Sequence, residues 1–171
     1  VDRLKDRWLF SLTTLVFHVS IIAVTIFLAG HVQLWKPTLG FAWPALPNYL
    51  ATALTLVALL SATALIVERL ASRDSRALSR FQDYAIPAMV AGPFVSGLLV
   101  MHPGLNPFPF EAALLVHVLS ANLLLVLIPL TKLSHMALLP VTQFVSEWSW
   151  HFPPNAGSQV ATTLNKEGDP I

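Results

Sequence analysis

Six histidines are the residues of this chain best suited to chemistry, and four of them stand within strongly apolar stretches. His18 and His31 lie in the first such stretch, and His117 and His135 lie in the last. Ionisable residues within a membrane span are rare and usually functional. Since imidazole nitrogens are axial ligands of haem iron and bundle cores supply them from facing helices, these four histidines predict b-type haem.

The order of these histidines along the chain arranges them in two pairs across the bundle. The first and last helices run antiparallel, because three crossings separate them. His18 then lies at the level of His135, and His31 lies at the level of His117. Two such pairs would hold two stacked haems, one near each face of the membrane.

Helical geometry supports this pairing only in part. The two histidines of the last helix are 18 residues apart, about five turns, and share one face. Those of the first helix are 13 residues apart, which leaves them roughly 140° off a common face. A tilt, a distortion near Pro129 or haems on different sides of the first helix would absorb the difference. Alternatively, His102 replaces one member of the outer pair.

The elements that carry these residues follow from composition. The chain is 55% hydrophobic and only 11% charged, whereas a soluble domain has about 25% charged residues. A spanning helix needs roughly 20 apolar residues. The uncharged stretches and the turn-rich segments between them predict helices near 8–34, 48–70, 84–102 and 110–136. The predicted fold is therefore an all-α integral membrane four-helix bundle.

Basic residues orient the four helices. They cluster before the first helix and in the second connection: Arg3, Lys5, Arg7, Arg69, Arg73, Arg76 and Arg80. The other two connections hold one basic residue, Lys36. Under the positive-inside rule, the N-terminus and the C-terminus both lie on the cytoplasmic side of a multi-pass protein of the inner membrane.

The chain divides into a bundle, residues 1–136, and a more polar cytoplasmic tail, residues 137–171. The tail is interpreted either as a disordered end or as a docking strip for a partner, because Trp148, Trp150 and Phe152 are costly to leave in water. Cysteine is absent, so any iron–sulfur relay must lie in another chain. A net charge of +1 gives no attraction to nucleic acid.

Two segments of the chain resemble a known family. FHVSIIAVTIFLAGHVQLW and HVLSANLLLVLIPLTKLSH are similar to the haem-b membrane (gamma) subunit of respiratory nitrate reductase. They are closer still to the related subunits of heterodisulfide-reductase-like and sulfite-reduction-associated complexes. The resemblance covers roughly residues 8–140. Its most specific elements are the Gly30-His31 pair, the 18-residue spacing in the last helix and the TKLSH-x4-P run that ends at Pro140.

The resemblance implies bis-histidine ligation of two b haems. His18 and His135 would bind the cytoplasmic-side haem, and His31 and His117 the outer one. It further implies an electron-transfer subunit of a quinone-linked oxidoreductase, working between the membrane quinone pool and a cytoplasmic iron–sulfur subunit. The 13-residue spacing fits the sulfur-metabolism relatives better. Those relatives usually carry a further helix before the first one here, so a reduced or partial version is expected.

A quinone site is expected beside the outer haem. Gly30 leaves room there, and Lys36 is either a hydrogen-bond donor to a quinone carbonyl or an interfacial anchor. His102 is then a loop cap or a proton acceptor at this outer site. The alternative function is a cofactor-free membrane anchor for a soluble redox enzyme, in which the histidines only join helices.

Overall fold

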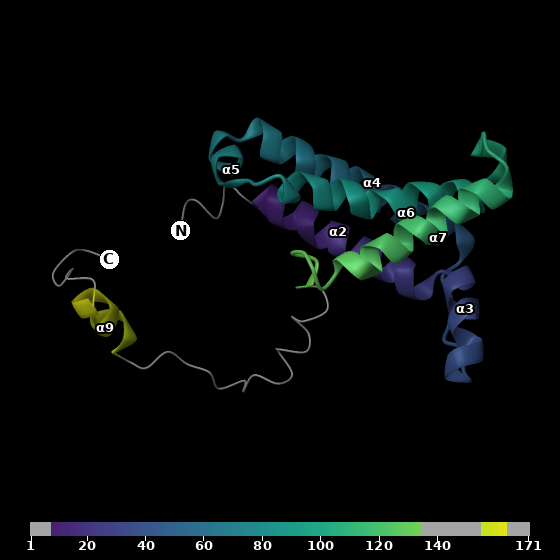
Figure 1. Ribbon diagram of the computed structural model, residues 1–171, viewed down its shortest axis with the longest axis horizontal. Helices are drawn as coiled ribbons and strands as arrows, with labels where there is room; N and C mark the ends of the chain where they lie inside the picture. Colours follow the sequence, from purple (N-terminus) through teal and green to yellow (C-terminus); the bar gives the residue numbers. More distant parts are fainter. Residues whose placement is uncertain (1–7, 135–154, 164–171) are drawn as a thin grey trace. The chain divides into compact units, whose positions relative to one another are not determined.

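The computed structural model describes residues 8–134 and 155–163, and within these residues every regular element is helical (Figure 1). The elements are α2 (Trp8–Phe27), α3 (Ala29–Leu39), α4 (Asn48–Ala71), α5 (Arg73–Leu78), α6 (Gln82–Met101), η1 (Pro103–Leu105), α7 (Phe110–Leu127) and α9 (Ala156–Thr163). Of these, α2, α4, α6 and α7 are long and apolar enough to cross a membrane. The predicted all-α fold with four spans is therefore confirmed, and the chain is a multi-pass membrane protein.

The four spans pack in chain order within the unit formed by residues 1–132. The principal contacts join α2 to α4, α4 to α6 and α6 to α7. The packed face of α4 repeats at intervals of four and three residues, and most of its side chains are small: Ala51, Thr55, Ala58, Ala62 and Leu65. Small residues let helices approach closely where lipid provides no hydrophobic driving force for association.

Outward-facing surfaces of the spans are apolar, as a lipid environment requires. Leu60 on α4 is 70% exposed and Leu125 on α7 is 64% exposed, and further large apolar side chains are exposed along α2, α4 and α7. Several hydroxyl groups of the spans donate to a carbonyl of their own helix. Thr55 Oγ1, for example, donates to the carbonyl of Ala51 at 2.8 Å. Such bonds keep a polar group satisfied without water.

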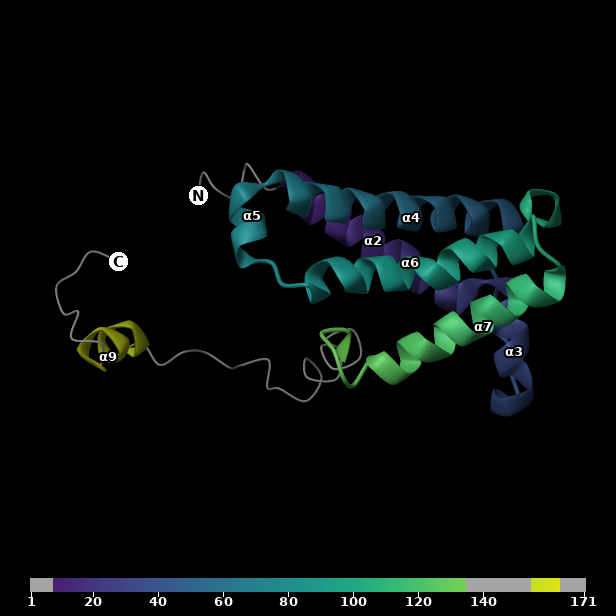
Figure 2. The ribbon, with the colours of Figure 1, turned by 45° about the horizontal axis from the view of Figure 1, so that its top comes forward.

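The first predicted helix, 8–34, differs from the structure, because the chain breaks it in two. Leu28 has φ −63° and ψ 132°, which is extended rather than helical backbone, and it separates α2 from α3. Both ribbon views show α3 turning away from the line of α2 (Figures 1 and 2). Helix α3 ends at Leu39. The next residue, Gly40, takes the left-handed conformation, φ 77°, that glycine adopts without strain.

The other predicted helices agree more closely with the structure. Those near 48–70 and 84–102 match α4 and α6 to within two residues at either end. The last predicted helix, 110–136, is regular only as far as Leu127 and is followed by turns and a bend at residues 128–133. Within residues 133–171, which form a second unit, the described element is the short helix α9. Trp148, Trp150 and Phe152 of the predicted docking strip lie outside the described residues.

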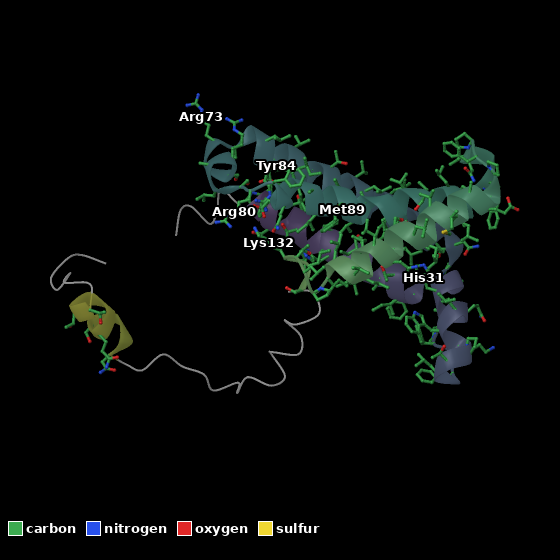
Figure 3. The ribbon with its side chains drawn as sticks, viewed as in Figure 1. His31, Arg73, Arg80, Tyr84, Met89 and Lys132 are labelled. Atoms are coloured by element: carbon green, nitrogen blue, oxygen red, sulfur yellow. The ribbon has the colours of Figure 1, made fainter. Side chains whose placement is uncertain are left out.

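Polar contacts tie the spans together at one end. Asp83, at the start of α6, pairs with Lys132 beyond α7 at 2.7 Å and accepts the backbone N–H of Arg80 at 2.8 Å. Arg69, at the end of α4, lies 6.0 Å from the ring of Phe10 near the start of α2. Figure 3 shows Arg80, Tyr84 and Lys132 near this end and His31 toward the other. The basic connection between α4 and α6 therefore lies at the end of the bundle where these non-covalent contacts join the spans.

Candidate functional site: a histidine pair between α3 and α7

The rings of His31 and His117 meet although they are 86 positions apart in the numbering. Their centroids are 6.1 Å apart and their planes are inclined by only 14°. His31 belongs to the first turn of α3 (Figure 3), and His117 belongs to the middle of α7. The principal helix contacts of the described residues do not pair α7 with α2 or α3. The two helices therefore meet through these side chains rather than through close backbone packing.

His117 lies on the face of α7 that packs toward α6. Its Nδ1 atom is 2.8 Å from the carbonyl oxygen of Pro93 and 3.4 Å from Oγ of Ser96. A helical side chain covers the turn before its own Cα, so Gly97 leaves the Pro93 carbonyl uncovered. A Cβ atom at Gly97 would come within 3.0 Å of Cε1 of His117. The ring of His117 therefore packs directly against the backbone of α6 at Gly97, where no side chain intervenes.

His31 and His18 make the same kind of bond as His117. Nδ1 of His31 is 2.8 Å from the carbonyl of Thr25, and Nδ1 of His18 is 2.7 Å from the carbonyl of Thr14. A carbonyl oxygen only accepts, so Nδ1 must be the protonated nitrogen, and the lone pair of the neutral ring is on Nε2. Metal-binding histidines characteristically donate their second nitrogen to a backbone carbonyl or carboxylate in this way.

His102 is held differently. Its Nε2 atom is 3.0 Å from Oγ1 of Thr52, which joins the end of α6 to the start of α4. The structure therefore brings His117 to His31, and it brings His102 to α4. Gly30 and Lys36 both belong to α3; a Cβ on Gly30 would meet open space, and Lys36 is exposed. Among the described residues, no recorded hydrogen bond or ring contact joins these two residues to His102.

The second predicted pair falls partly outside the described part of the chain. His18 is half-buried in α2, and its ring meets the ring of Phe17 edge-on at 5.3 Å. His135 lies outside the described residues, as does His151. The pairing of His18 with His135 therefore stays a prediction.

The separation of the His31 and His117 rings matches in size that of two imidazoles that bind one metal ion. A metal–nitrogen distance of about 2.0 Å, plus roughly 1 Å from nitrogen to ring centre, places two such rings about 6 Å apart. The observed separation is 6.1 Å. Within residues 8–134 and 155–163, no three or more His, Cys, Asp or Glu side chains gather as a metal site. A centre with two protein ligands matches these residues better than one with three or four.

Sequence reasoning missed the residues that hold these rings. Thr25, Pro93 and Gly97 support the two histidines through backbone atoms or through the lack of a side chain, which residue type alone does not reveal. One signal was available: Pro93 and Gly97 are four residues apart on one face of a span, where each departs from ordinary helix composition.

Fold and site together define a multi-pass α-helical membrane protein with a histidine pair between α3, which follows the first span, and the last span, α7. The chain is 35% identical over 135 residues to a curated protein of Nitratidesulfovibrio vulgaris, which is named only "Protein". The matched region covers 78% of this chain and 58% of that relative, so the chain spans less than two thirds of the relative's length. No protein-family model matches the chain. No solved structure matches it either.

Proposed function

We propose that this chain is a cytochrome b membrane subunit in which His31 and His117 would hold a b-type haem. The observation that carries the proposal is the pair itself: two near-parallel imidazoles 6.1 Å apart, each donating from Nδ1 to a backbone carbonyl. When bound, b-type haem supplies a one-electron carrier. A second haem, held by His18 and His135, follows from the resemblance of the sequence to the haem-b family.

The protein's part in this function is to hold and orient the two rings. The carbonyls of Thr25 and Pro93 fix the Nδ1–H tautomer of each ring and make Nε2 a better ligand. Ligand identity, hydrogen bonding and burial are the means by which a protein sets the potential of such a centre.

The proposed role is to pass electrons between membrane quinone and a cytoplasmic iron–sulfur subunit of a respiratory complex. The lack of cysteine in the chain supports a separate partner for any iron–sulfur cluster. Gly30 and Lys36 remain candidates for a quinone site, because both belong to the helix that carries His31. The bond of His102 to Thr52 favours a structural role for that histidine over a place in the same site.

A reduced-minus-oxidised absorption spectrum of the purified chain tests the proposal. A b-type α band is expected in the wild type. His31→Ala and His117→Ala should each remove the same haem, so the double variant should lose no more haem than either single variant. His102→Ala is the matched control and should retain full haem content. A wild-type chain without the α band would contradict the proposal and favour the cofactor-free anchor.

A further inference from the structure

The break at Leu28 interrupts the hydrogen bonding of the first span. Backbone bonds run from Leu28 N to the carbonyl of Val24 and from Val32 N to the carbonyl of Leu28. Between them, the three bonds that a continuous helix would make to the carbonyls of residues 25–27 are replaced by others. Inside a membrane such carbonyls need donors, because no water is there to supply them.

Each of the three carbonyls has a substitute donor. Thr25 accepts from Nδ1 of His31 at 2.8 Å. Ile26 accepts from Nε1 of Trp43 at 3.0 Å. Phe27 accepts from the backbone N–H of Leu46 at 2.8 Å. Two of these donors come from the connection between α3 and α4, so this connection caps the end of α2.

The burial of the connection agrees with this role. Across residues 40–47 the side chains are exposed except for Trp43 and Leu46, which are half-buried. These are the two residues that supply donors to the end of α2. The segment therefore contacts the first span at the positions that satisfy its interrupted carbonyls.

Without these donors, the most direct way to satisfy the same carbonyls is to close the helix. Ala29, Gly30 and His31 would then donate their backbone N–H groups to residues 25–27. In that continuous helix the carbonyl of Thr25 accepts the backbone N–H of Ala29. The hydrogen bond from Nδ1 of His31 to the Thr25 carbonyl is then lost. The ring of His31 would lose the hydrogen bond that orients it, and the direction of α3 would change. Both changes would separate the His31 ring from His117.

We propose that Trp43 is a positioning residue for the histidine pair. Through its bond to Ile26, it keeps the first span broken at Leu28 and so directs His31 toward His117. The effect of Trp43 on a haem rests on the proposed function. Its effect on the break at Leu28 does not depend on haem. The two parts are therefore measured separately.

Spin-label distances test the structural part without any haem. The chain has no cysteine, so the Ile22→Cys and Leu34→Cys pair places one label on α2 and one on α3. A continuous helix would separate these two Cα atoms by about 18 Å. Adding Trp43→Phe, which keeps the aromatic ring but removes the N–H donor, should shift the distance distribution toward that of a continuous helix. Trp35→Phe, at a tryptophan 50% exposed on α3, is the control. An unchanged distribution with Trp43→Phe would overturn the proposal.

The haem signature tests the functional part. In the full chain with haem bound, Trp43→Phe should change the electron paramagnetic resonance signal and midpoint potential of the haem that His117→Ala removes. Trp35→Phe should leave both at their wild-type values. A shifted label distance with an unchanged haem signal would refute the positioning role. A wild-type chain without haem would refute the proposed function, and the label distances alone would then decide whether Trp43 holds the break.

A backbone variant covers the case in which Trp43→Phe fails to insert. Leu46→Pro removes the N–H that serves Phe27, and it should produce the same shift in label distance. Ala45→Pro is its matched control, because it stiffens the same segment and leaves the Leu46 and Trp43 donors in place. Equal distance distributions in the two proline variants would contradict the proposal.

Discussion

Gly97 on α6 lies directly against the imidazole of His117 on α7. A Cβ atom at Gly97 would approach Cε1 of that ring to 3.0 Å and Nδ1 to 3.2 Å. These separations are shorter than ordinary van der Waals contact, so either the ring or the helix must shift if a methyl group is added. The same ring atom, Nδ1, donates to Pro93. Displacing the ring therefore also strains the hydrogen bond that orients it.

Gly97→Ala should disturb the haem held by His31 and His117 while the chain still folds. We expect that haem to be reduced in occupancy or altered in its resonance signal, because the ring moves off its seat. Gly92→Ala is the matched control on the same helix, since a Cβ there would lie 3.9 Å from Cβ of Ser120, an ordinary contact. Equal haem spectra for the two variants would show that a methyl group at position 97 does not displace the ring of His117.

Removal of the Thr52–His102 bond should reduce stability without changing the haem spectrum. Thr52→Val deletes the hydroxyl that contacts Nε2 of His102 at 3.0 Å and thereby loosens α4 from the end of α6. Hydrogen bonds between membrane helices contribute on the order of 1 kcal/mol, so a loss of about that size in unfolding free energy is expected. Thr63→Val is the control, because that hydroxyl bonds only to its own helix at Leu59. A lost or altered haem band in Thr52→Val would assign His102 to the haem site.

The sequence was sufficient to predict the spans, because lipid imposes length and composition on them directly. The helices expected near 48–70 and 84–102 begin and end within two residues of α4 and α6. The same apolar composition concealed the break at Leu28, because Phe27, Leu28 and Ala29 suit a continuous helix. The break depends on donors from Trp43 and Leu46, which are distant in sequence. Local periodicity carries no information about such partners.

The candidate site was predictable to the extent that it depends on residue type. Histidines in apolar stretches are conspicuous, and the antiparallel order of the first and last helices predicts that His31 and His117 lie at one level. The break at Leu28 lies between His18 and His31, so the 13-residue spacing does not by itself determine the relative direction of these two side chains. The supporting atoms are mostly backbone carbonyls, which every residue possesses, so the sequence could not single out Thr25 or Pro93.

Loss of the Asp83–Lys132 pair should have a small effect on stability that depends on salt. Lys132 is 52% exposed at its side chain and Asp83 is 13% exposed, so water and ions screen the pair from one side. Asp83→Asn should lower the unfolding free energy by about 1 kcal/mol or less, and the loss should shrink in high salt. Glu111→Gln, an exposed acid in the first turn of α7, is the control. A large effect that persists in high salt would contradict the description of a screened ion pair, because an asparagine amide oxygen can still accept the Arg80 N–H.

The membrane orientation inferred from basic residues can be tested by labelling single introduced cysteines, because the chain has no cysteine of its own. Arg73→Cys lies in the connection between α4 and α6, and Gly104→Cys lies between α6 and α7. Since these connections are on opposite sides of one span, only one should react with an impermeant maleimide in intact cells. The positive-inside rule predicts labelling of Gly104→Cys at the outer face and protection of Arg73→Cys until the cells are opened. The reverse pattern would invert the topology and move the pair of His31 and His117 to the cytoplasmic side.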